Sequence, residues 1–183
     1  MAAAGTVAAV RSALDETFAR LDALCTMPAD LLLGRPSYPG AWTVAEHLEH
    51  VTLANRFLLL TIAKGVATAL RRARTQPVAA EESDLDRLAP IAEPGAFPWE
   101  PPGHMIPTGT MPVAQVRALL ARQREECLEL LARMAGGEGT LCIFRMSVYG
   151  LGRIDTYQWL YFLVQHGRWH LEFLARREAG GSG

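Results

Sequence analysis

The sequence predicts an all-α protein, a four-helix bundle in the order up, down, down, up. Four stretches carry apolar residues at every third or fourth position, the spacing of one face of a helix. No stretch is convincing as a strand, so the helices have to bury their apolar faces against one another. The irregular segment 75–110, rich in proline, separates the second and third stretches and predicts a long crossover between helices two and three.

Length and composition predict one globular domain. The chain has 183 residues, of which 50% are hydrophobic and 20% charged, an ordinary balance for a folded domain. We expect that domain to span residues 1–179, with the closing Gly-Gly-Ser-Gly at 180–183 as a flexible tail.

Charge and cysteine content limit the function classes. A formal net charge of −1 gives no case for nucleic-acid binding, which depends on clustered Lys and Arg. The three cysteines form neither a C-x-x-C pair nor a disulfide framework, so we expect a reducing compartment, the cytoplasm. The N-terminus lacks a basic region before its apolar run, and no stretch reaches about 18 apolar residues. Neither export nor membrane insertion is predicted.

Two amphipathic helices are predicted in the N-terminal half. The first covers about 6–25, and the Pro- and Gly-rich chain at 26–41 connects it to the second. Thr43 followed by Glu46 forms a capping box ahead of an apolar run, so the second helix begins there and continues to about Arg74.

Two further helices are predicted in the C-terminal half. Helix three runs from about Pro112 to Met134, and Asp155 or Thr156 caps helix four. Gln123 interrupts the apolar stripe of helix three and is predicted to be a core amide with hydrogen-bond partners.

The connections contain little regular structure in this prediction. Within the crossover, a short helical turn is expected near Ser83–Leu88, with Ser83 as its cap. The stretch 140–152 can hold a short extended piece but is too brief to support a sheet.

The last helix carries two histidines, His166 and His170, four residues apart. This spacing puts both imidazoles on one helix face about one turn apart. Neutral ring nitrogens there can bind zinc, nickel or iron at roughly 2.0–2.1 Å. Two histidines on a helix are often packing or surface residues instead. Apolar neighbours such as Trp159 and Phe162 favour inward-pointing imidazoles that need partners.

Helix two offers a third histidine. His47 and His50 both lie on it, but only His50 shares a stripe with Leu53 and Phe57, so His50 is the better inward candidate. His50 lies about seven residues, or roughly 10 Å, from the start of its helix, and His170 lies about as far from the end of the last helix. If the two helices are antiparallel, three imidazoles meet at one depth and form the open kind of metal site used in catalysis.

Two motifs resemble the DinB-like (DinB/YfiT) family of four-helix-bundle metalloenzymes. The run WTVAEHLEH, from Trp42 to His50, is similar to that family's W-[ST]-x-x-E-x-x-x-H entry to helix two. The run from Gly152 to His170 is similar to its G-x-[LI]-[TD] lead into a helix with H-x-x-x-H. The resemblance in helix number, order and crossover covers nearly the whole chain.

The resemblance implies a metal site and a mode of assembly. His50, His166 and His170 would be the ligands of a divalent ion, most often nickel or zinc, and the protein would form a homodimer. One position departs from the family pattern, because Phe173 stands where members commonly carry Gln.

The resemblance also implies a type of chemistry. Characterised relatives include thiol-dependent transferases and isomerases that use bacillithiol or mycothiol. We therefore expect a small-molecule substrate, a low-molecular-weight thiol as partner, and a metal-activated thiolate that attacks an electrophile. A metal-dependent hydrolase is the nearest alternative. A stress-response scaffold that binds metal or ligand without catalysis is the second.

The sequence also predicts roles for four residues besides the histidines. Glu46, one turn before His50, is the catalytic candidate, either as a base or to orient a ligand. Its alternative role is the capping box at the start of helix two. Trp99 and the crossover are candidates for a pocket wall, whereas Trp42 and Trp159 are assigned to the core.

Overall fold

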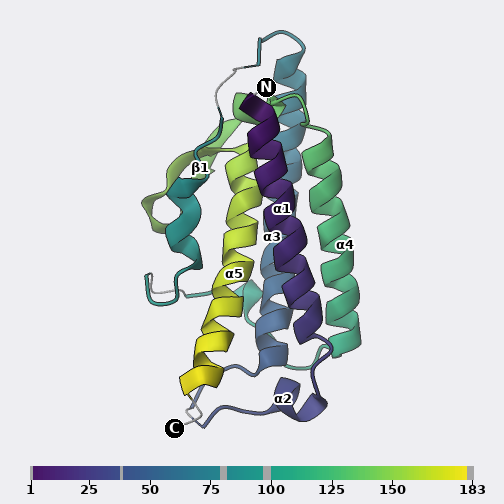
Figure 1. Ribbon diagram of the computed structural model, residues 1–183, viewed down its shortest axis with the longest axis vertical. Coiled ribbons are helices and arrows are strands. Elements are labelled where there is room, and N and C mark those ends of the chain that lie inside the picture. The colour runs from purple at the N-terminus through teal and green to yellow at the C-terminus, as the bar shows by residue number, and fades with distance from the viewer. Residues whose placement is uncertain (1, 38, 79–81, 97–99, 181–183) are drawn as a thin grey trace.

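In the computed structural model, which describes residues 2–37, 39–78, 82–96 and 100–180, the chain is mostly helical. Four long helices in these ranges lie side by side along the longest axis of the molecule (Figure 1). They are α1 (Ala2–Leu24), α3 (Val44–Ala73), α4 (Val113–Ala132) and α5 (Thr156–Gly180). The rest of the predicted tail, 181–183, lies outside the described residues.

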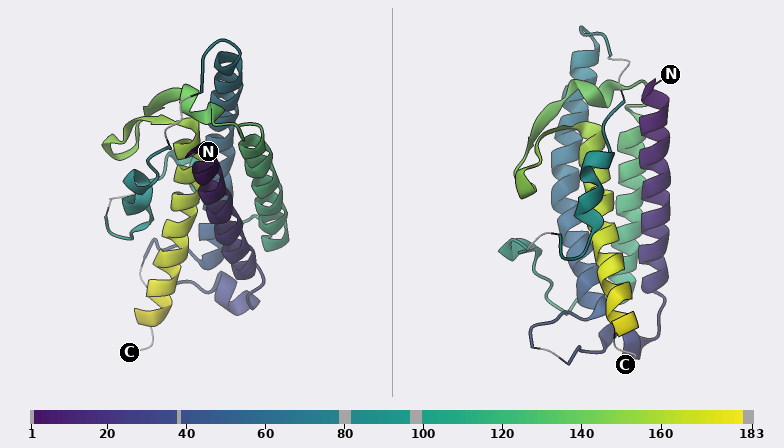
Figure 2. Two further views of the ribbon diagram at one scale, coloured as in Figure 1. Left: turned by 45° about the horizontal axis from the view of Figure 1, so that its top comes forward. Right: turned by 60° about the vertical axis from the view of Figure 1, so that its left-hand side comes forward.

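The long helices enclose one hydrophobic core. Both α1 and α3 pack against α4 and α5, so each long helix has two close neighbours (Figure 2). Each helix contributes side chains that are almost completely removed from solvent, among them Leu14, Ile62, Leu120 and Leu160. Full burial of such a side chain is worth about 1.5–3 kcal/mol.

Contacts at the helix ends show that α3 and α5 are antiparallel. Near the end of α5, Arg177 donates from Nη1 to the carbonyl oxygen of Trp42, just before α3, at 2.9 Å. Near the end of α3, Arg72 donates to the carbonyl oxygen of Leu141, which precedes α5, at 2.7 Å. This is the relative direction that the predicted histidine site requires.

The capping box at the start of α3 forms as predicted. Thr43 Oγ1 accepts from the Glu46 amide at 3.1 Å, and Glu46 Oε2 accepts from the Thr43 amide at 2.7 Å. Two backbone amides that no helical carbonyl can reach are thereby satisfied. The helix begins at Val44, directly after its cap.

Gln123 is the satisfied core amide that the sequence predicts. Its Oε1 accepts from Asn55 Nδ2 at 3.2 Å, and its Nε2 donates to the carbonyl oxygen of Thr52 at 2.9 Å. Because all three groups are buried, these bonds offset the cost of removing the amides from water. They also join α4 to α3, because Gln123 belongs to α4 and its two partners belong to α3.

Short helices occupy the connections, and one prediction about them was wrong. Ser83 does not cap a turn at 83–88: its hydroxyl donates to Asp155 Oδ2 at 2.6 Å, across the fold. A 3-10 helix begins slightly later instead. The short helices are α2 (Ala29–Leu33), η1 (Asp86–Ala92), η2 (Gly103–Met105), η3 (Glu138–Leu141) and η4 (Val148–Gly150).

A small antiparallel hairpin precedes α5, which corrects the expectation that this stretch is too short for a sheet. Strands β1 (Ile143–Met146) and β2 (Gly152–Asp155) pair with Met146 opposite Gly152. The chain reverses because Gly150 and Gly152 adopt positive φ angles of 66° and 68°. The second strand was missed since its residues were read as the lead into the helix.

An aromatic ring of the hairpin packs against two of the long helices. Phe144 of β1 stacks on Trp159 of α5 with centroids 4.6 Å apart. It also approaches α3 at Gly65, where an added Cβ would come within 2.9 Å of the ring. At the end of β2, Asp155 and Gln158 exchange backbone-to-side-chain bonds of 2.9 Å, so Asp155 is the cap of α5.

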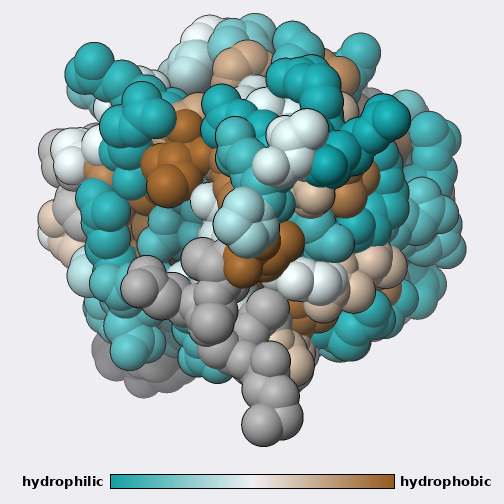
Figure 3. Space-filling view, turned by 90° about the horizontal axis from the view of Figure 1, so that it is seen from above, coloured by the Kyte–Doolittle hydropathy of each residue, from teal (hydrophilic) through white to brown (hydrophobic). Residues whose placement is uncertain are grey.

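The surface of the molecule and the hydropathy of its helices can be compared with the prediction that no segment inserts into a membrane. Seen from above, the molecule mixes hydrophilic residues with scattered hydrophobic ones (Figure 3). Among the described residues, α3 alone is long and apolar enough to pass a length-and-composition test for a membrane span. Core helices pass the same test, and α3 carries buried His, Glu and Asn side chains that are costly in lipid.

Candidate metal centre

The structure brings the three predicted histidines together. His50 comes from α3, while His166 and His170 come from successive turns of α5. One ring nitrogen of each lies within 4.8 Å of the others. The three residues are buried, with exposed fractions of 5%, 6% and 3%.

The spacing of the nitrogens fits one divalent ion. His166 Nε2 lies 3.3 Å from His50 Nε2 and 3.2 Å from His170 Nε2. Two nitrogens bound at roughly 2.0–2.1 Å to one tetrahedral ion are about 3.3 Å apart. Three imidazoles are also the donor type that zinc and nickel accept. The histidine cluster is therefore compatible with a metal site.

Burial keeps these imidazoles in the neutral form that binds metals. It lowers the pKa of His166 to about 3, with a further contribution from His50. The pKa of His170 is lowered well below its usual value, first by burial and then by the neighbouring histidines. For His50, burial also lowers the pKa, although the hydrogen bond to Met105 opposes it. Such neutral rings have lone pairs available near pH 7.

A backbone contact sets which nitrogen of His50 is free. His50 Nδ1 lies 2.7 Å from the carbonyl oxygen of Met105, in η2. A carbonyl can only accept, so Nδ1 carries the hydrogen and Nε2 keeps its lone pair toward His166. Partners of this kind orient ligand histidines in metal sites.

A buried carboxylate places the segment that supplies this carbonyl. Glu49, 2% exposed, accepts from the backbone and hydroxyl of Thr108 at 2.8 Å each and from the Gly109 amide at 3.0 Å. These bonds fix residues 108–109, which follow Met105 closely in the chain, against α3. The sequence analysis missed Glu49. Its position next to His50, on a helix that buries its apolar face, was the available signal.

His47 is also part of the cluster, contrary to the emphasis on His50 as the inward histidine. It is 6% exposed, and its Nδ1 lies 3.0 Å from Nδ1 of His170. When Nε2 of His170 binds an ion, its Nδ1 carries the hydrogen and donates to His47. Burial is the largest cause that lowers the pKa of His47 to about 3, and the charges of Arg177 and His50 add to it. The His47 ring is therefore neutral and can accept a hydrogen bond.

We predict that His47 positions His170 for metal binding. His47→Phe keeps a ring beside Trp42 but removes the accepting nitrogen, so affinity for zinc or nickel should fall by about 10–100-fold. His47→Asn, whose Oδ1 can replace Nδ1, should recover part of the loss. Competition with a chromogenic chelator measures the affinity. His104→Phe, at an exposed histidine, is the matched control; equal affinities in His47→Phe and wild type would contradict the role.

Glu46 takes the capping role that was the alternative to catalysis. Besides the capping box, its Oε1 accepts from Arg35 Nη2 at 3.0 Å. Burial raises its pKa, but the bonds from Thr43 and Arg35 outweigh this and lower it overall. A carboxylate with a lowered pKa is a weak base. Glu46 is absent from the described residues that line the cavity, and its catalytic role stays a prediction.

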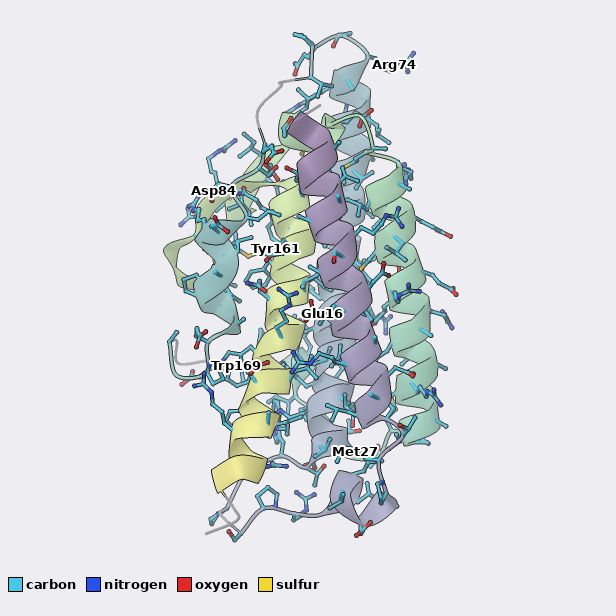
Figure 4. All side chains as sticks on the ribbon, in the orientation of Figure 1. Glu16, Met27, Arg74, Asp84, Tyr161 and Trp169 are labelled. Atoms are coloured by element: carbon cyan, nitrogen blue, oxygen red, sulfur yellow. The ribbon has the colours of Figure 1, made fainter. Side chains whose placement is uncertain are left out.

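The histidines open onto a cavity of about 900 Å³. Trp42, assigned to the core from the sequence, is only partly buried and lines this cavity, 5.0 Å from the His50 ring by centroids. Trp159 is buried and also lines it. Trp169 lies on the side of α5 toward the segment between η1 and η2 (Figure 4). Trp99, the predicted wall residue, lies outside the described residues.

Fold and site together define a helical protein with a buried three-histidine cluster at the base of a cavity. A family model described as the DinB superfamily matches residues 7–174. The chain therefore belongs to the DinB superfamily, as its two motifs indicated. Neither the search of curated proteins nor the search of solved structures gave a match.

Proposed function

We propose that the protein is a metal-dependent enzyme of the thiol-dependent S-transferase or isomerase type. His50, His166 and His170 hold the divalent ion, nickel or zinc. The observation that carries the proposal is that three neutral, buried imidazoles converge at the base of a cavity large enough for a substrate. A bound ion there would lower the pKa of a thiol and so supply a thiolate.

The chain's own cysteines are unsuited to supply that thiolate. Burial raises the pKa of Cys25 to about 11 and that of Cys127 to about 12. Among the described residues that line the cavity, none is a cysteine. The nucleophile would therefore be an external low-molecular-weight thiol. Its sulfur forms the new bond to the electrophilic carbon, while the leaving group departs with the electrons of the broken bond.

The roles of the protein groups follow from their contacts. His47 and the Met105 carbonyl orient two of the ligand rings. The aromatic walls exclude water from the reacting thiolate, which strengthens its interaction with the electrophile.

Turnover with an added thiol tests the proposal. Protein loaded with nickel or zinc is mixed with a thiol and 1-chloro-2,4-dinitrobenzene, and formation of the thioether is followed by absorbance. We expect a rate that needs both metal and thiol. Metal-dependent cleavage of p-nitrophenyl acetate without thiol would favour the hydrolase alternative. Stoichiometric metal without either rate would favour a binding scaffold.

The wider features of the proposal rest on the resemblance and on the sequence. They are a four-helix bundle in the order up, down, down, up with residues 75–110 as the crossover, a homodimer, a cytoplasmic location and a role in stress response. Exposed apolar side chains such as Phe57 and Leu60 on α3 are compatible with a dimer contact. Sedimentation velocity measures the oligomeric state.

A further inference from the structure

We propose that the cavity above the histidines takes an uncharged, largely aromatic or apolar molecule. That this molecule is the substrate rests on the function proposed above. Its binding preference follows from the walls alone.

Among the described residues, six Trp and Phe rings line the cavity. They come from α3, from α5 and from the segment just before α3, so the walls belong to different parts of the chain. Aromatic surface of this kind favours flat apolar ligands, which stack on rings or meet their edges. The rings are Trp42, Phe57, Trp159, Phe162, Trp169 and Phe173.

The rings continue from the mouth of the cavity to the histidines. Phe57, 49% exposed, lies at the mouth with its centroid 5.5 Å from that of His104. Beside the histidines, Phe173 stacks on Trp169 with centroids 5.2 Å apart and lies 5.3 Å from the His47 ring. Because neighbouring rings hold one another, the apolar surface exists before a ligand arrives.

The wall offers almost no charge to a ligand. Glu100 is the sole charged side chain among the described lining residues if the histidines are neutral, and it is exposed. Arg35 and Arg177 are not among the described lining residues, and both are engaged: Arg35 with Glu46 and Arg177 with the Trp42 carbonyl. In the protein without metal, an anionic ligand would lose its hydration without gaining a cationic partner among the described lining residues, which is costly. A cationic ligand would likewise lose its hydration and find only the exposed Glu100.

The size of the cavity suits a ligand of this class. Pockets for drug-sized molecules measure about 300–1,000 Å³, and this cavity of about 900 Å³ lies in that range. It has room for a two- or three-ring molecule together with a small thiol.

Two dyes of nearly the same shape test the preference. N-phenyl-1-naphthylamine is neutral, and 8-anilinonaphthalene-1-sulfonate is the same ring system with one sulfonate. In the protein without metal, we expect the neutral dye to bind at least about tenfold more tightly, because the sulfonate finds no cation on the described part of the wall. N-(1-naphthyl)ethylenediamine, which is cationic, should also bind more weakly than the neutral dye. Equal or tighter binding of either charged dye would overturn the proposal.

A charge added to the wall locates the dyes. Ser147 lines the cavity and is exposed, so Ser147→Arg can place a guanidinium at the wall without opening the core. We expect this variant to bind the sulfonate dye at least about tenfold more tightly than wild type. Ser12→Arg, on the exposed face of α1, is the matched control and should leave both affinities unchanged. Equal effects of the two substitutions would place the dyes elsewhere and refute the proposal.

The dye measurements separate this proposal from the proposed function. They are made on wild-type protein without added metal, so that only the walls act on the dyes, and they need no turnover. If the neutral dye is preferred but no metal- and thiol-dependent rate appears, the cavity preference stands and the enzymatic proposal fails. If the rate appears but the dyes show no preference, the enzymatic proposal stands and the cavity preference fails.

Discussion

His166→Ala is expected to leave the purified protein with almost no bound nickel or zinc while its helices remain. His166 is the central member of the cluster, since its Nε2 lies within 3.3 Å of Nε2 of both His50 and His170. The two remaining ligands would hold an ion loosely. We expect the affinity for metal to fall by more than about 100-fold, which exceeds the loss expected when only a residue that orients a ligand is removed. His50→Ala should have the same effect.

The fold should survive these substitutions because its core does not depend on the histidines. Buried aliphatic side chains from all four long helices pack together away from the cluster. Metal content by inductively coupled plasma mass spectrometry and helicity by circular dichroism are the two measurements. His104→Ala, an exposed histidine on η2, controls for loss of any imidazole. Unchanged metal content in His166→Ala and His50→Ala would refute the site.

Acidification is expected to destabilise the metal-free protein between pH 7 and 5. Burial lowers the pKa of His47 and of His166 to about 3, whereas an unfolded histidine titrates near 6.5. The unfolded chain therefore binds more protons, and stability present above pH 6.5 is lost as the pH falls toward 3. Each of these two histidines should lower the free energy of unfolding by about 2 kcal/mol between pH 7 and 5. Together this is a large part of a typical stability of about 5–15 kcal/mol.

Urea unfolding at several pH values measures this loss. Asp22 and Glu46 do not cause the loss above pH 5, because their lowered pKa values and ordinary values of 3.8 and 4.5 make their contributions disappear at lower pH. Asp155, whose pKa burial raises, acts in the opposite direction, because its carboxyl binds a proton more readily in the folded chain. In His47→Gln/His166→Gln the slope of stability against pH should become flatter but not disappear, because the pKa values of His50 and His170 are also lowered. A wild-type free energy of unfolding that is constant from pH 7 to 5 would contradict the prediction. Bound zinc should shift the loss to lower pH, since protons then compete with the ion.

The long helices were predictable because they depend on local interactions, although α1 begins at Ala2, ahead of the predicted start near residue 6. The periodicity of apolar residues and the Thr43–Glu46 box involve residues only a few positions apart, and α3 begins where they indicate. The hairpin before α5 was not predictable by the same reasoning. Each of its strands has four residues, too few for a periodicity, and the pairing depends on the reversal at Gly150 and Gly152.

In the candidate site, too, the residues that depend on spacing within a helix were predictable, and those that depend on contacts between elements were not. Helix spacing alone was enough to select His166 and His170, and helix register with an antiparallel partner added His50. The stripe argument placed His47 second to His50, yet both are buried. His47 is directed inward because its ring has Trp42 on one side and Phe173 on another, contacts that come from outside its own helix.

The sequence by itself determined the helical class of this protein, the motifs that place it in its family, and the three histidines that converge. These features follow from residue types at short, regular spacings. Only the tertiary structure decided which nitrogen of His50 is free, that His47 meets His170, and that the cavity is lined by rings almost without charge. The reason is distance along the chain: the Met105 carbonyl that orients His50 is 55 residues away from it, and His47 is 123 residues from His170.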